Sequence, residues 1–112
     1  MINFAKGKAI NPNEVVDYQN GGIVSMEFLH NESGSITLFA IAKGQQLSPH
    51  SAPFDALVQV TDGEMVMVLD NVEHVVKAGE LFMIPSGRIH SVRADMNFKM
   101  LITMISRATS VK

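Results

Sequence analysis

Short apolar segments separated by turn residues run along most of the chain, and this pattern predicts an all-β fold. The apolar segments read GIVSMEFL, SITLFAIA, DALVQVT, EMVMVLD, VEHVVK, ELFMIP, IHSVR and FKMLITMIS. Most have the length of a strand, and strands at such close spacing are typical of a β-sandwich or a barrel. Only residues 11–22 contain a candidate helical turn, and we interpret that segment mainly as loop.

Two segments alternate between apolar and polar residues, and each therefore predicts a strand with one buried face. In the first segment, residues 54–61, every second residue is apolar: Phe54, Ala56, Val58 and Val60. The exception is Leu57, an apolar residue at a position where the pattern is polar. The second segment, residues 97–105, does the same with another four: Phe98, Met100, Ile102 and Met104.

Two turn sequences predict hairpins between neighbouring strands. Asp62-Gly63 lies between two apolar runs and is a strong hairpin signal, because both residue types tolerate a positive φ. Asp70-Asn71 is a similar but weaker signal. With no repeat and no low-complexity segment, the pattern predicts one antiparallel barrel or jelly roll formed by residues 1–112.

Composition and charge exclude several classes of protein. The 112 residues carry a formal net charge of −2 and no basic stripe, so we expect no nucleic-acid partner. No segment approaches the roughly 18 consecutive apolar residues of a membrane span, so we expect no membrane partner. The sequence has no cysteine and starts without the long apolar core of a signal peptide. We therefore expect a cytoplasmic protein.

Eight methionines and no tryptophan make the apolar content unusual. One interpretation is that the flexible thioether side chains fill irregular gaps in the core. The other is that they line a pliable apolar pocket for a ligand. The sequence by itself favours the first interpretation, since methionine commonly fills such gaps.

Two glycine- and histidine-containing motifs resemble those of the cupin superfamily. The first combines Gly44, His50 and the later Gly63, and the second reads GELFMIPSGRIH, from Gly79 to His90. The two motifs occur in the order of that family, and the resemblance covers about residues 35–106. It implies a double-stranded β-helix (jelly-roll) barrel with a ligand site inside its wide end. It also implies a homodimer, and apolar strands near both chain ends are consistent with pairing across a two-fold axis.

The resemblance implies that His50 and His90 point inward and are candidate metal ligands. The metal-binding pattern of the family has two further ligands, a histidine and a glutamate, where this chain has Ala52 and Ala56. Two histidines alone would hold a divalent transition metal weakly, because sites of this kind use three or four protein ligands. Asp55 and Gln59 lie near the missing glutamate, but strand alternation puts both on the opposite face unless a bulge turns them inward.

Other polar residues give weaker signals. His30 lies in the turn-like HNESGS and is expected in solvent, and His74 lies in a strand and is expected to point outward. Arg88, near His90, is either a rim residue that attracts an anionic ligand or a simple surface charge.

These observations leave three interpretations open. The first is a small-molecule-binding barrel with a partly apolar internal pocket lined by His50 and His90. The second is a metal-dependent cupin enzyme of the dioxygenase or isomerase type that uses the same two histidines as ligands. The third is a barrel filled by its own side chains, in which both histidines are only hydrogen-bonded. The sequence assigns no catalytic residue and names no cofactor, because it lacks the third ligand that a metal enzyme needs.

Overall fold

The structure is a computed structural model that describes residues 6–106, and within these residues it is built almost entirely from β-strands. In chain order its elements are η1 (Pro12–Glu14), β1 (Ile23–Asn31), β2 (Gly34–Ile41), β3 (Gln46–His50), β4 (Asp55–Asp62), β5 (Glu64–Leu69), β6 (Val72–Lys77), β7 (Leu81–Ile84), β8 (His90–Arg93) and β9 (Phe98–Ile105). The element η1 is a single 3-10 turn, which agrees with the interpretation of residues 11–22 as mainly loop.

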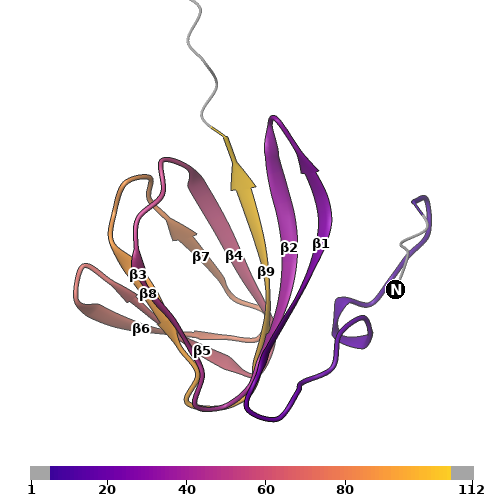
Figure 1. The fold of residues 1–112 in the computed structure, drawn as a ribbon, viewed down its shortest axis with the longest axis horizontal. Helices are drawn as coiled ribbons and strands as arrows, with labels where there is room; N and C mark the ends of the chain where they lie inside the picture. Colours follow the sequence, from indigo (N-terminus) through magenta and orange to yellow (C-terminus); the bar gives the residue numbers. More distant parts are fainter. Residues whose placement is uncertain (1–5, 107–112) are drawn as a thin grey trace, which may run out of the picture.

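The strands form two antiparallel sheets that enclose an interior. One sheet has the order β1-β2-β9-β4-β7 and the other has the order β3-β8-β5-β6. Figure 1 shows the two sheets facing each other, drawn together at the lower end of the view and separated at the upper end. This arrangement confirms the all-β, jelly-roll prediction.

The predicted apolar runs all become strands, and one further strand has no apolar run. β3 has the sequence QLSPH, which lacks an apolar run and contains Pro49. A proline lacks the N–H that a central strand would need, whereas an edge strand tolerates it. β3 is an edge strand paired only with β8, so it forms through that partner rather than through its own sequence pattern.

The hairpin prediction at Asp62-Gly63 is wrong. β4 and β5, which flank this turn, lie in different sheets, so the turn carries the chain from one sheet to the other and does not form a hairpin. Only Gly63 has a positive φ there, at 72°, whereas a two-residue hairpin of the common type requires two such residues. Asp70 and Asn71 meet this requirement, with φ of 49° and 68°, and they join the paired strands β5 and β6.

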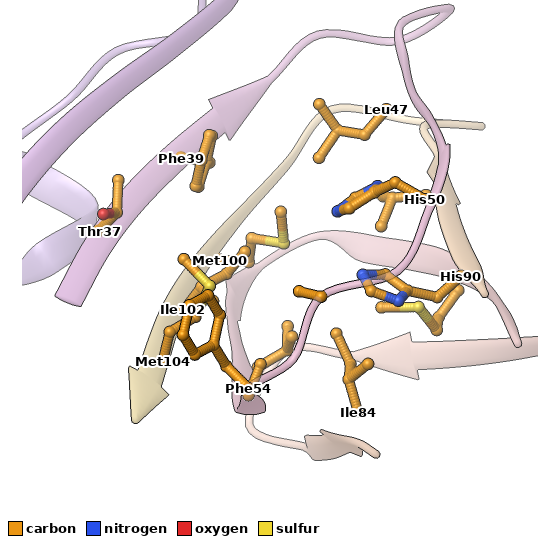
Figure 2. A pocket seen from close by; sticks show the side chains of 15 residues that line it. Thr37, Phe39, Leu47, His50, Phe54, Ile84, His90, Met100, Ile102 and Met104 are labelled. Carbon is orange, nitrogen blue, oxygen red and sulfur yellow. The ribbon is translucent and has the colours of Figure 1, made fainter. Parts of the chain in front are cut away.

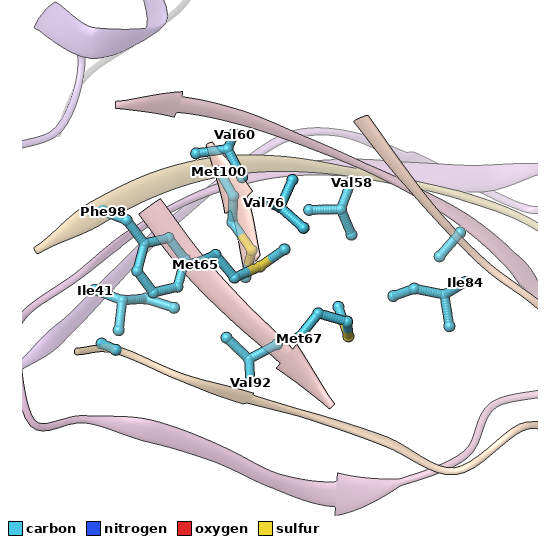
Figure 3. Close-up of a cluster of buried hydrophobic side chains, with 12 residues drawn as sticks. Ile41, Val58, Val60, Met65, Met67, Val76, Ile84, Val92, Phe98 and Met100 are labelled. Carbon is cyan, nitrogen blue, oxygen red and sulfur yellow. The ribbon is translucent and has the colours of Figure 1, made fainter. Parts of the chain in front are cut away.

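The main core lies between the two sheets and follows the predicted alternation. Ala56, Val58 and Val60 of β4 are buried, and so are Phe98 and Met100 of β9. Figure 3 shows this cluster, in which side chains of β5 lie among those of the facing sheet. Met65 and Met67 of β5 have no solvent exposure, in agreement with the interpretation that methionines fill the core.

A second cluster lies on the outer face of the five-stranded sheet, where the N-terminal segment (residues 12–18) covers part of that face. Val16 packs there against Leu38 and Ala40. The Lys99 ammonium donates a hydrogen bond to the Asn13 carbonyl oxygen at 2.7 Å and lies 4.9 Å from the centre of the Tyr18 ring. The segment is thus held by polar contacts as well as by packing.

The rest of that outer face is not covered by residues 12–18, and much of it is apolar. One row of paired residues crosses all five strands, and we call it the outer apolar row: Met83, Leu57, Thr103, Ile36 and Leu29. Met83 is 61% exposed and the neighbouring Ile105 is 63% exposed. The N-terminal segment therefore leaves a largely apolar strip of the sheet uncovered, and Met83 and Leu29 at its two ends are its exposed residues.

Candidate functional site

A pocket of about 180 Å³ lies between the two sheets. Figure 2 shows its walls, with His50 and His90 on one side and with Thr37, Phe39, Ile102 and Met104 on the other. All but three of its lining residues, namely Thr37, His50 and His90, have apolar side chains. The apolar ones are Phe39, Leu47, Ala52, Phe54, Ala56, Val58, Met67, Ile84, Val92, Met100, Ile102 and Met104.

A turn between β7 and β8 positions His90. Pro85 follows the last residue of β7, and Gly87 has a positive φ of 79°, which glycine adopts without strain. The Gly87 N–H donates a 2.8 Å hydrogen bond to the Ala52 carbonyl oxygen, so the turn is tied to the segment that follows His50. His90 then begins β8.

An irregularity in β3 positions His50. Leu47 pairs with Val92 and His50 pairs with His90, so two residues of β3 lie opposite one residue of β8. Leu47 and His50 are an odd number of residues apart, and in a regular strand they would point to opposite faces. Because the extra residue shifts the alternation, both side chains line the same pocket.

The two imidazole rings lie side by side, with centroids 4.4 Å apart and planes inclined at 57°. His50 Nδ1 lies 2.9 Å from the Ser48 carbonyl oxygen, and His90 Nδ1 lies 3.1 Å from the Arg88 carbonyl oxygen. A carbonyl oxygen only accepts hydrogen bonds, so Nδ1 must be the donor in each ring. In the neutral rings, Nε2 is then left as an acceptor.

The pocket reaches the surface near one of its histidines. His90 is only 9% exposed, whereas His50 is exposed and Phe54, which also lines the pocket, is 36% exposed. The pocket therefore has an inner imidazole at His90 and an outer one at His50. A small molecule has access along the side where His50 and Phe54 lie.

The pocket does not hold the ligands of a closed metal site. Ala52 and Ala56 line it, at the positions where the family resemblance implies a histidine and a glutamate. Asp55 does not line the pocket, and its carboxylate accepts a 3.2 Å hydrogen bond from the Ser86 N–H. Gln59 lies in a shallow depression beside Glu80 and Leu81, away from the pocket. Across residues 6–106, no three His, Cys, Asp or Glu side chains are grouped as metal ligands.

The other sequence candidates lie outside the pocket. The side chain of His30 is 67% exposed, as expected, and its nearest charged partner is Glu27 at 3.7 Å. The prediction that His74 points outward is wrong: strand alternation puts it on the same face as the buried Val76, and its ring lies 5.2 Å from that of Phe82. Arg88 pairs with Asp70, so its charge is already matched by a carboxylate.

Sequence reasoning did not identify several of the residues that form the pocket walls. Thr37 and Phe39 come from β2, Leu47 from β3, and Val92 from β8. Strand alternation does group Thr37 with Phe39, and it groups Val92 with His90. The pairing of β2 with β9 and of β3 with β8 was the missing information.

Comparison with known proteins identifies the fold and the sequence family. A family model described as "Cupin domain" matches residues 37–106. A cupin 2 conserved barrel domain protein from Leptotrichia buccalis is 40% identical, with a TM-score of 0.81 over 83% of this chain and 45% of that chain. This chain therefore spans less than half the length of that relative.

Two other solved structures match along almost the whole chain. A conserved protein of unknown function from Streptococcus pyogenes is 25% identical, with a TM-score of 0.90 over 96% of this chain and 95% of that chain. A cupin superfamily protein from Desulfitobacterium hafniense is 22% identical, with a TM-score of 0.88 over 95% of this chain and 97% of that chain, and this likeness shows the fold alone. No curated protein matches the sequence significantly.

Proposed function

This chain belongs to the cupin domain family, and on that premise we propose that it binds a small, largely apolar organic molecule between its two sheets. His50 and His90 form the polar end of the proposed site. The observation that carries this proposal is the lining of the pocket, which is apolar except for these two histidines and Thr37. Ligand sites in proteins are typically concave and apolar with a few well-placed polar groups.

The size and lining of the pocket argue against a barrel filled by its own side chains. Interiors are packed with few voids larger than a water molecule, and about 180 Å³ exceeds that size several times. Water is stable in a cavity when it finds two to four polar partners, which the apolar part of this lining does not offer. An apolar ligand gains about 25 cal/mol for each Å² of apolar surface that it removes from water.

The test is a titration of the protein with a panel of small aromatic and aliphatic compounds, read by NMR of methionine methyl groups. Met67, Met100 and Met104 line the pocket, whereas Met26 packs in the outer cluster and Met83 is exposed. We expect binders to shift the first three signals and to leave the other two unchanged. The proposal would be contradicted if no compound of the panel shifted the methyl signals of the pocket methionines.

A matched pair of variants checks the location. Ala56→Leu extends a side chain into the pocket from β4, and we expect it to abolish binding. Gln59→Leu adds the same side chain three residues along the same strand, outside the pocket, and we expect it to preserve binding. Equal binding by the two variants would mean that the compounds bind elsewhere.

A second candidate function is that of a metal-dependent cupin enzyme. It is favoured by the Nδ1 hydrogen bonds of His50 and His90 to backbone carbonyls, because such bonds leave Nε2 free as a ligand. The donor set does not fit a tightly held metal, since Ala52 and Ala56 supply no ligand. Metal analysis of protein purified without a histidine tag distinguishes the candidates: stoichiometric metal would favour the enzyme.

We also propose that two copies of the chain associate through the outer apolar row. Monomeric proteins rarely expose contiguous apolar patches of large size, and such patches mark interaction surfaces. A two-fold dimer uses the same surface on both copies, and a largely apolar row across a sheet is suited to packing against a second copy of itself.

A further inference from the structure

We infer that the ligand of this pocket is a single aromatic ring that carries one hydrogen-bond donor, as in a phenol, with the donor directed at the imidazoles of His50 and His90. This inference rests on the proposed function, because it presupposes that the pocket binds a small molecule. It specifies the chemistry of that molecule from the hydrogen-bonding state of the two rings and from the side chains that face them.

The proton positions in the two rings are set by their backbone partners. Ser48 and Arg88 each present a carbonyl oxygen to Nδ1, at 2.9 Å and 3.1 Å, and a carbonyl oxygen has no proton to give. Each Nδ1 therefore carries the proton, and each neutral ring keeps a lone pair on Nε2. The same type of bond fixes the orientation of both rings, so the two acceptors are held in place before a ligand arrives.

The two Nε2 atoms cannot form a hydrogen bond with each other, because both are acceptors. Figure 2 shows that the ring nitrogen farther from the backbone points toward the pocket in both histidines. Two acceptors cannot bond to each other, although their rings are only 4.4 Å apart. The only other polar side chain of the lining, Thr37, lies on the opposite wall. A ligand that supplies an O–H or N–H to this end of the pocket provides the missing donor.

Arg88, a cation near His90 in the sequence, is already paired with Asp70. The two imidazoles are therefore the groups that meet the polar end of a ligand, and a hydroxyl or an N–H matches their Nε2 acceptors.

The apolar walls favour an aromatic body over an aliphatic one. Phe39 and Phe54 line the pocket together with the sulfur-bearing side chains of Met67, Met100 and Met104. Aromatic pairs and sulfur–aromatic contacts are each favourable beyond the burial of area. Apolar cavities of roughly 150 Å³ accept a benzene molecule, so about 180 Å³ is suited to one ring with a small substituent.

The test compares phenol, toluene and anisole as ligands of the untagged protein in the presence of EDTA. The three share one ring; toluene lacks the oxygen, and anisole keeps the oxygen but lacks its proton. Dissociation constants come from the methyl signals of Met67, Met100 and Met104. We expect phenol to bind about tenfold more tightly than either of the others, which is the usual gain from a hydrogen bond formed on binding.

A double variant, His50→Phe with His90→Phe, removes both acceptors and keeps two rings. We expect it to bind toluene as the parent does and to lose the preference for phenol. Toluene or anisole binding as tightly as phenol to the parent protein would overturn the donor inference while the pocket proposal stands. If neither these three compounds nor the wider panel shifts the signals of the pocket methionines, the donor inference and the pocket proposal are both overturned. The parent protein decides these outcomes even if the double variant does not fold.

Discussion

Tyr18 is a single residue whose titration can be read directly, because it is the only tyrosine in a chain without tryptophan. Burial raises the pKa of Tyr18, and the hydrogen bond that its hydroxyl donates to the Asp62 carboxylate raises it further, as does the charge of that carboxylate. We expect the absorbance of tyrosinate to develop with a midpoint above the ordinary value of about 10. A midpoint at that ordinary value in the folded protein would contradict the contact.

The same shift predicts how stability depends on pH. Folding raises the pKa of Tyr18, so the contribution of this group to stability is complete below the unfolded-state pKa of about 10. It is lost as the pH rises from there through the folded-state pKa. We therefore expect the difference in Tm between the parent and Tyr18→Phe to narrow above pH 10. Asp62→Asn, which removes the charge, is the control and is expected to lower the tyrosinate midpoint.

Ala52 and Ala56 are the residues that separate this pocket from a metal site. Both line the pocket with His50 and His90, so Ala52→His together with Ala56→Glu would add two inward ligands. Affinity for Zn²⁺, measured by calorimetry, is expected to rise by at least about two orders of magnitude, because a two-point contact becomes a closed coordination shell.

The control for this variant adds the same residue types to the other face of β4, as Gln59→His with Leu57→Glu. Equal Zn²⁺ affinity in the two double variants would show that positions 52 and 56 do not converge with the histidines. That His50 and His90 bind a metal in the parent protein stays a prediction, which the metal analysis of untagged protein tests.

At the scale of single residues, the sequence identified the two histidines but not the reason that both face the pocket. The family motifs pointed to His50 and His90 by spacing alone. Counting from Leu47 along a regular strand puts His50 on the wrong face, and only the irregular pairing with β8 corrects it. Pro49 was the one visible sign of that irregularity, and it is ambiguous because proline also marks loops.

Among the turns, Gly63 and Gly87 both have a positive φ but differ in their surroundings. A Cβ atom at Gly63 would lie 2.2 Å from the Asn97 carbonyl oxygen, whereas at Gly87 it would meet no atom within 4 Å. We expect Gly87→Ala to reduce the free energy of unfolding by about 1 kcal/mol, the cost of the backbone conformation alone. Gly63→Ala is expected to cost more, because the backbone of Asn97 must also move. Urea denaturation of the two variants measures the difference, and equal losses would refute the explanation.

At the scale of the elements, the sequence predicted where strands form better than which strands pair. The eight apolar runs each became a strand because period-two burial is a local property. Pairing is not local: β2 adjoins β9, and β3 adjoins β8. The Asp62-Gly63 turn misled for this reason, since a turn sequence reports the local bend and not the sheet to which the next strand belongs.

For the whole molecule, the outer apolar row predicts the oligomeric state. We expect the parent protein to sediment as a dimer and Met83→Glu with Ile105→Glu to sediment as a monomer. Both side chains are more than half exposed, so the charges should disrupt association without unfolding the chain. Val75→Glu, at a residue of β6 that is 56% exposed in the other sheet, is the matched control and is expected to remain dimeric. A monomeric parent protein, or a dimer that survives the double variant, would contradict the interface.

Two other expectations stay predictions: that residues 1–112 form one domain, and that the protein is cytoplasmic. Within residues 6–106, no helix is long and apolar enough to cross a membrane.

The place of β9 in the middle of the five-stranded sheet has a consequence for biosynthesis. β9 follows the other strands of residues 6–106, yet it is the strand that joins β2 to β4. Until residues 98–105 leave the ribosome, the β1–β2 pair and the β4–β7 pair remain separate, and the edges of β2 and β4 that β9 later joins stay unpaired. Such late, long-range closure is slow and leaves unpaired strand edges open to aggregation, so we expect this chain to fold late in its synthesis despite its small size.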